Sequence, residues 1–139
     1  MKQVESFVLG TGEVTFHVEP GYLRVEERGD PESVAQMQAY AAAMERVRAR
    51  ADVPAMLIVA QRAAQTQAVS DWQAIREARW RALAASGAKR IAVIVDEELA
   101  VARVRMAAIA AKANVRGFVQ EADAVAWLRG AGGARTTRS

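Results

Sequence analysis

Two short apolar runs without alternation constrain the fold of this 139-residue chain more than any other feature. Residues 55–60 and 91–95 carry apolar side chains at every position, so each strand must be covered on both faces. Amphipathic helical patterns lie before, between and after these runs, and residues 115–119 add another short strand. This alternation predicts an α/β domain with three parallel strands at its centre, divided by helices.

The first thirty residues predict strands. Val14, Phe16 and Val18 alternate with polar residues, and the Pro20-Gly21 pair then turns the chain into a second strand at residues 22–28. We therefore expect an antiparallel hairpin beside the parallel strands, which makes a small mixed sheet. We expect residues 1–12 to form an N-terminal extension, in which residues 7–9 could add a short strand.

Helix starts and inward faces are predicted from caps and spacing. Asp30 followed by Pro31 predicts the start of the first helix. Ser70, with Gln73 three residues later, forms a capping box for the second. The inward face of the third helix is expected to be Ala102, Met106, Ile109 and Ala113.

Composition favours one domain, assigned to residues 13–130, and the glycine-containing residues 131–139 predict a disordered tail. The chain has no Cys, which excludes disulfides and thiolate metal sites. It shows no leader pattern and no apolar run of membrane-spanning length, so we expect a cytoplasmic protein. Because 19 basic residues face 16 acidic ones, the charge indicates a mixed surface, and we do not expect a nucleic-acid partner.

No residue pattern supports catalysis, so we expect no enzyme, no cofactor and no metal site. His17 is the single histidine, and strand alternation places it on the exposed side, opposite Phe16. Asp96 and Glu97 follow a parallel strand and could hold Mg²⁺, but capping of the next helix explains them equally well.

The helix after the first buried strand carries the candidate binding residues. Trp72 and Trp80 lie eight residues apart and share one side, with Arg76 and Arg79 beside them. Trp and Arg are the side chains that anchor protein interfaces. We expect these four residues to bind a protein partner, or a second copy in a homodimer. Packing of both tryptophans under loops and a neighbouring helix is the alternative.

The order of elements, a hairpin, three helix–strand units and a last helix, resembles the SpoIIAA-like superfamily over residues 13–130. The resemblance is carried by residues 89–96, the Ala-rich helix after them, residues 115–119 and the closing Ala126-Trp127-Leu128. This superfamily includes STAS domains, which are anti-sigma factor antagonists, and relatives of the CRAL-TRIO lipid-binding fold. It implies a regulatory or scaffolding domain that binds protein, with a small-molecule or lipid carrier as the alternative.

In sigma-antagonist members, a phosphorylatable serine lies near the start of the helix after the first parallel strand, within an Asp-Ser-x-Gly type of motif. The corresponding residues 61–72 lack that motif and its glycine. Ser70 is the serine near this helix start and is therefore the candidate phosphorylation site, although its role as an N-cap is the simpler explanation.

Overall fold

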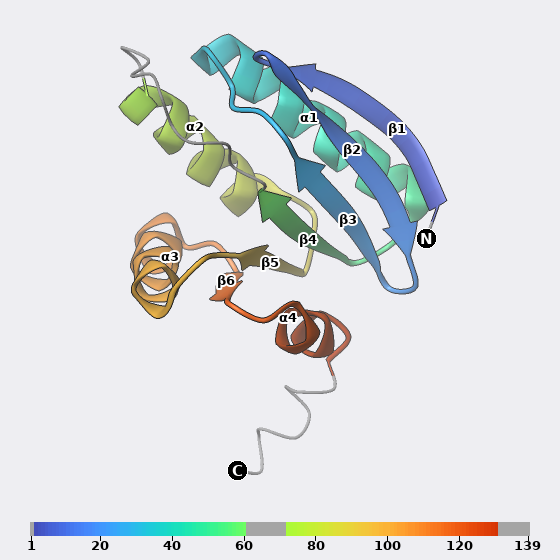
Figure 1. Ribbon diagram of the computed structural model, residues 1–139, viewed down its shortest axis with the longest axis vertical. Coiled ribbons are helices and arrows are strands. Elements are labelled where there is room, and N and C mark those ends of the chain that lie inside the picture. Colours follow the sequence, from blue (N-terminus) through green and yellow to red (C-terminus); the bar gives the residue numbers. More distant parts are fainter. Residues whose placement is uncertain (1, 61–71, 131–139) are drawn as a thin grey trace.

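The computed structural model describes residues 2–60 and 72–130, which contain six strands and four helices (Figure 1). The strands are β1 (Lys2–Leu9), β2 (Gly12–Glu19), β3 (Tyr22–Glu27), β4 (Ala55–Ala60), β5 (Arg90–Ile94) and β6 (Val115–Phe118). The helices are α1 (Val34–Ala51), α2 (Trp72–Ala85), α3 (Glu98–Ala111) and α4 (Glu121–Leu128).

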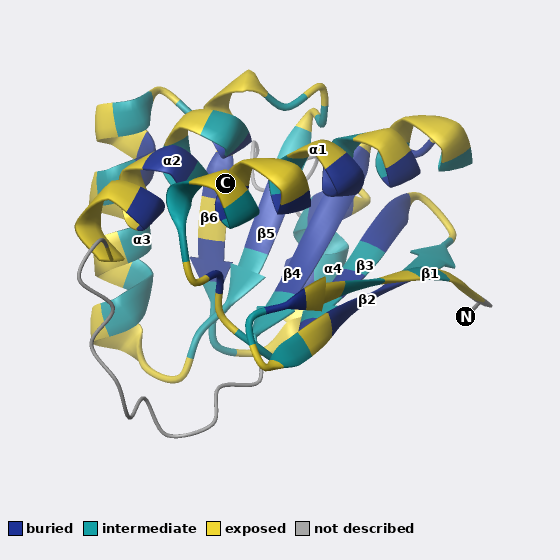
Figure 2. Cartoon of the chain, turned by 90° about the horizontal axis from the view of Figure 1, so that it is seen from above, coloured by how far each residue is buried: buried dark blue, intermediate teal, exposed yellow. Residues whose placement is uncertain are grey.

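The strands form one mixed sheet whose spatial order follows the chain, β1-β2-β3-β4-β5-β6. β1, β2 and β3 pair antiparallel, and β3 to β6 pair parallel. The expected α/β class is confirmed, and the parallel part also includes the second strand of the hairpin. Because each parallel strand is added beside its predecessor, α1, α2 and α3 lie as crossovers along one face of the sheet (Figure 2).

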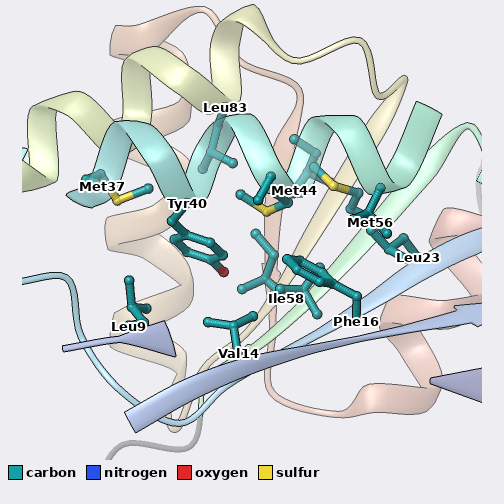
Figure 3. Packing of buried hydrophobic residues seen from close by; sticks show 14 of the residues in the cluster. Leu9, Val14, Phe16, Leu23, Met37, Tyr40, Met44, Met56, Ile58 and Leu83 are labelled. Atoms are coloured by element: carbon teal, nitrogen blue, oxygen red, sulfur yellow. The ribbon is translucent and has the colours of Figure 1, made fainter. Parts of the chain in front are cut away.

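Two apolar clusters hold the layers together. The larger lies between the sheet and the crossover helices, where Phe16, Tyr40 and Met56 are almost fully buried (Figure 3). The smaller lies on the opposite face, where Leu128 of α4 packs with Leu57 and other residues of β4 and β5. The central strands are thus covered on both sides, as their unbroken apolar runs require.

The N-terminal residues form a full strand of the sheet. β1 pairs with β2 from Lys2 to Leu9, and its register shifts between Gln3 and Glu5. Gly10 makes the turn with a φ of +62°, which suits glycine. Phe7 stacks on the ring of Tyr40 in α1, with the ring centroids 5.9 Å apart. The extension expected at residues 1–12 is therefore an edge strand packed against the core.

The start of α1 differs from the expectation. Ser33 is the N-cap, and its hydroxyl accepts a hydrogen bond from the backbone N–H of Gln36 at 3.0 Å. The Gln36 side chain accepts in return from the N–H of Glu32 at 2.8 Å. Asp30 and Pro31 precede the helix, so the prediction that they begin it was wrong. The capping-box pattern Ser-x-x-Gln at residues 33–36 indicates the observed start of the helix.

The inward face of α3 was predicted correctly only at Ala113, which packs against the main core just after the helix. Met106 is 71% exposed and Ile109 is 66% exposed. Ala108 is buried instead, and Val104 packs against the main core. Apolar residues occur on nearly every side of α3, so spacing alone could not select the inward face.

α3 packs closely against the sheet at Gly117 in β6. A Cβ atom there would lie 3.3 Å from Cβ of Val104 and 3.4 Å from Cα of Val101. Because Gly117 has no side chain, the side of α3 that carries Val101 and Val104 can pack directly against β6. None of the four described helices combines the length and apolar character that crossing a bilayer requires.

Candidate protein-interaction surface

The four binding residues predicted on α2 have different surroundings. Trp72 is 54% exposed, and the Arg76 guanidinium lies over its ring at 5.7 Å. Trp80 is half-buried and packs against the main core. Arg79 turns inward. Trp72, Arg76 and Trp80 therefore contribute to the outer side of α2, whereas Arg79 does not.

Arg79 belongs to a buried polar cluster at the end of β3. Its Nη1 donates a hydrogen bond to Oε2 of Glu27 at 2.8 Å, and the Tyr40 hydroxyl donates to the same oxygen. The guanidinium also lies over the Tyr40 ring, 5.9 Å from its centroid. Burial, followed by the charge of Glu27, raises the pKa of Tyr40 well above its usual value. The cluster joins α1, α2 and β3, so Arg79 has a structural role here.

A groove of about 420 Å³ runs between α2 and α3. It exists because the positions of α3 that face α2 are alanines. Trp80 and Ala84 line it from α2, and alanines line it from α3. The complete lining is Gln73, Arg76, Glu77, Trp80, Arg81, Ala84, Ala107, Ala110 and Ala111. Two of the predicted binding residues, Arg76 and Trp80, therefore line this groove.

The outer side of α3 extends the apolar lining of this groove. Leu99, Met106 and Ile109 are exposed and lie seven and three residues apart, which places them in one stripe along the helix. Ala110 is one turn from Met106 and lines the groove, so stripe and groove are continuous. Figure 2 shows exposed residues recurring along α3. We call the groove together with Trp72, Leu99, Met106 and Ile109 the α2–α3 surface.

Large apolar side chains are concentrated on this surface. Six of them are exposed in the described part of the chain, and four belong to α2 or α3. The other two, Val4 and Val8, lie on the edge strand β1. Contiguous exposed apolar area on a folded domain marks an interaction site more often than scattered single residues do. Sequence reasoning missed the stripe because it assigned the same 3–4 spacing to the core.

Basic side chains border the apolar stripe. Arg76 and Arg81 of α2 line the groove, and Arg103 and Arg105 of α3 lie beside the stripe. Lys112 follows α3 as its C-cap. Within residues 2–60 and 72–130, the structure contains no ion pair of these five cations. The α2–α3 surface is therefore apolar along its centre and basic along its edges.

A second polar cluster lies on the opposite face of the sheet, beside α4. His17 is mostly buried there, with 14% of its side chain exposed, so the expectation of an exposed histidine was wrong. Its Nε2 lies 3.3 Å from the Thr15 hydroxyl and 3.8 Å from Glu26. Arg24 donates to Glu26 at 2.7 Å, which lowers the pKa of Glu26, and also to Glu121. Because its arginine and carboxylates bind one another, this cluster is less open to a partner than the α2–α3 surface.

The remaining candidate positions lie at the carboxyl ends of the parallel strands. Glu97 is the N-cap of α3 but makes no side-chain capping bond, and Asp96 before it is exposed. No group of three His, Asp or Glu side chains in the described ranges is arranged to hold a metal ion. Ser70 and the residues 131–139 lie outside the described residues.

Comparisons with protein-family models, with curated proteins and with solved structures gave no match to this chain. The class defined by its own geometry is an α/β domain with a mixed six-stranded sheet and an exposed, apolar and basic helical face.

Proposed function

We propose that this chain is a non-catalytic regulatory or scaffolding domain that acts by binding another protein through the α2–α3 surface. The observation that carries the proposal is the exposure of Leu99, Met106 and Ile109 beside the groove that contains Trp80. Removing apolar surface from water contributes about 25 cal/mol per Å². A partner that covers this stripe would therefore gain free energy that the isolated chain does not.

We also propose kinship with the SpoIIAA-like superfamily, and a cytoplasmic location. Support comes from the antiparallel hairpin, from the parallel strands added in chain order and from the three crossover helices on one face. In this kinship the chain is a STAS-like domain whose binding face lies on α2 and α3. The carrier alternative has less support, because the α2–α3 groove lies on the surface between two helices and the main core is filled by side chains.

The proposal is tested by removing the stripe without disturbing the core. The Met106→Ser/Ile109→Ser variant and the wild-type chain are each used to capture proteins from the native lysate, and each is weighed by light scattering. Val8→Ser is the matched control, because Val8 on β1 is 71% exposed, like Met106.

We expect the wild type and Val8→Ser to retain a common partner or a common oligomer, and the α3 variant to lose it. The proposal is wrong if all three chains behave alike, whether they bind the same proteins or remain lone monomers.

A further inference from the structure

We infer that the occupant of the α2–α3 surface is an amphipathic helix of a different protein, whose apolar stripe is flanked by acidic residues. This inference rests on the proposed function and adds the chemistry of the partner. It follows from the shape of the surface, from its charge and from the consequence of pairing it with a second copy.

The shape of the surface suits a helix. α2 and α3 pack side by side, and the alanines of α3 leave a hollow between them with Trp80 on one wall. The stripe runs from Leu99 to Ile109 along α3, so it extends over about 15 Å. A helix laid along such a groove contacts it through side chains at i, i+3 or i+4, and i+7. The apolar alanines and the Leu99, Met106 and Ile109 side chains would cover those anchors.

The basic charge of the surface favours a partner with negative charge. Arg76 and Arg81 lie on the α2 side, and Arg103, Arg105 and Lys112 lie along α3. The exposed acids are Glu77 and Glu98 within the helices and Glu97 at the N-cap of α3, so cations outnumber anions by five to three. Acidic residues beside the stripe of a partner would meet these cations at the rim of the contact.

Other arginines of the fold pair with carboxylates of the same chain. Arg24, Arg46, Arg48 and Arg79 each donate to a carboxylate of the same chain. The five cations that border the α2–α3 surface have no carboxylate partner among residues 2–60 and 72–130. Their pairing groups would therefore come from the bound helix.

A second copy of the chain fits this surface poorly. In a two-fold pairing of α3 helices, the middle of the stripe from Leu99 to Ile109 lies at Val104. Arg103 and Arg105 would then lie beside their own copies near the two-fold axis. Juxtaposed like charges disfavour the pairing, whereas a helix with acidic flanks converts the same arginines into attractive contacts.

The test uses the full chain and three peptides of about 18 residues, a length at which amphipathic helices begin to form. The first carries leucines at i, i+3, i+4 and i+7 flanked by glutamates. The second replaces each glutamate by lysine, and the third scrambles the order of the first. Binding is followed by calorimetry and by tryptophan fluorescence, at about 0.05 M and about 0.5 M salt.

We expect the acidic peptide to bind at least about tenfold more tightly than the other two, and more weakly at high salt. The Arg103→Glu/Arg105→Glu variant should reverse the preference and bind the lysine peptide. A variant that gains a ligand is folded, so this reversal separates charge selection from misfolding. Arg50→Glu is the control, because Arg50 is exposed on α1, away from the groove.

Equal binding of acidic and basic peptides overturns the inference, as does self-association that Met106→Ser/Ile109→Ser abolishes while the acidic peptide fails to bind. In both cases the proposed function survives. Binding to vesicles of phosphatidylglycerol and phosphatidylcholine, without binding to the acidic peptide, would instead identify a membrane surface as the occupant. If no peptide binds and no partner depends on Met106 and Ile109, both proposals fail.

Discussion

Arg79 of α2 donates a hydrogen bond to Glu27 at the end of β3, across 2.8 Å and 52 positions of the sequence. Glu27 is 4% exposed, and its second donor is the hydroxyl of Tyr40. A carboxylate buried among apolar residues is stable only when such donors surround it. The pair therefore fixes α2 against the carboxyl end of β3.

The first prediction concerns this ion pair. Glu27→Gln removes the negative charge and leaves the Arg79 cation largely buried without its partner. We expect the free energy of unfolding to fall by about 3 kcal/mol, measured by urea titration. The matched control is Glu13→Gln, an exposed position on β2, which should change it by less than about 0.5 kcal/mol. Equal effects of the two substitutions would contradict a stabilising role for the pair.

The second prediction concerns alkaline pH. Burial raises the pKa of both tyrosines of the chain, Tyr22 and, to a greater degree, Tyr40. A group whose pKa is higher in the folded state stabilises the fold below its unfolded pKa, and this contribution is lost as pH rises above about 10. We therefore expect the free energy of unfolding to fall above about pH 10, with tyrosinate absorbance appearing mainly on unfolding.

Tyr40→Phe isolates the larger contribution. This variant keeps the ring that stacks on Phe7 and loses the hydrogen bond to Glu27. It should be less stable by about 1 kcal/mol at neutral pH and should show a shallower loss of stability above about pH 10. An unchanged slope in this variant would assign the alkaline loss to other groups.

The third prediction compares two isoleucines. Ile109 on α3 is 66% exposed, whereas Ile91 on β5 is 2% exposed. Ile91→Ala should lower the free energy of unfolding by about 3 kcal/mol, because it leaves a cavity in the core. Ile109→Ala should lower it by less than about 0.5 kcal/mol. If Ile109→Ala proves the more damaging of the two, α3 presents the opposite face to the sheet.

The fourth prediction concerns the contact between α3 and β6. Gly117→Leu places a side chain where a Cβ atom already lies 3.3 Å from Val104 and 3.4 Å from Val101. We expect a loss of about 1–3 kcal/mol from overpacking, measured by thermal unfolding. Adding Val104→Ala should recover part of the loss, because it returns space beside the new side chain. Purely additive losses in the double variant would mean that the two side chains do not compete for space.

Much of the architecture was predictable because it depends on local patterns. The hairpin followed from alternation at Val14, Phe16 and Val18 and from the glycine turn, where Gly21 has a φ of +89°. The central strands followed from runs that require cover on both faces. The first helix is capped by Ser33 rather than by Asp30, although the sequence shows the capping-box pattern at Ser33 and Gln36.

The candidate site was predictable only in part. Trp72, Arg76 and Trp80 were found from their spacing on one helix, and all three contribute to the α2–α3 surface. Arg79 has the same local pattern and nevertheless turns inward, because Glu27 lies across from it in the folded chain. Glu27 lies 52 positions from Arg79, so the sequence around Arg79 does not indicate this contact.

The amino-acid sequence by itself determined the class of this protein, since an unbroken apolar strand can be stable only between two covering layers. The tertiary structure alone decided which side of α3 faces the sheet. That helix carries apolar residues all round, so the choice depended on the space that Gly117 leaves beside Val101 and Val104. The same choice left Leu99, Met106 and Ile109 facing water.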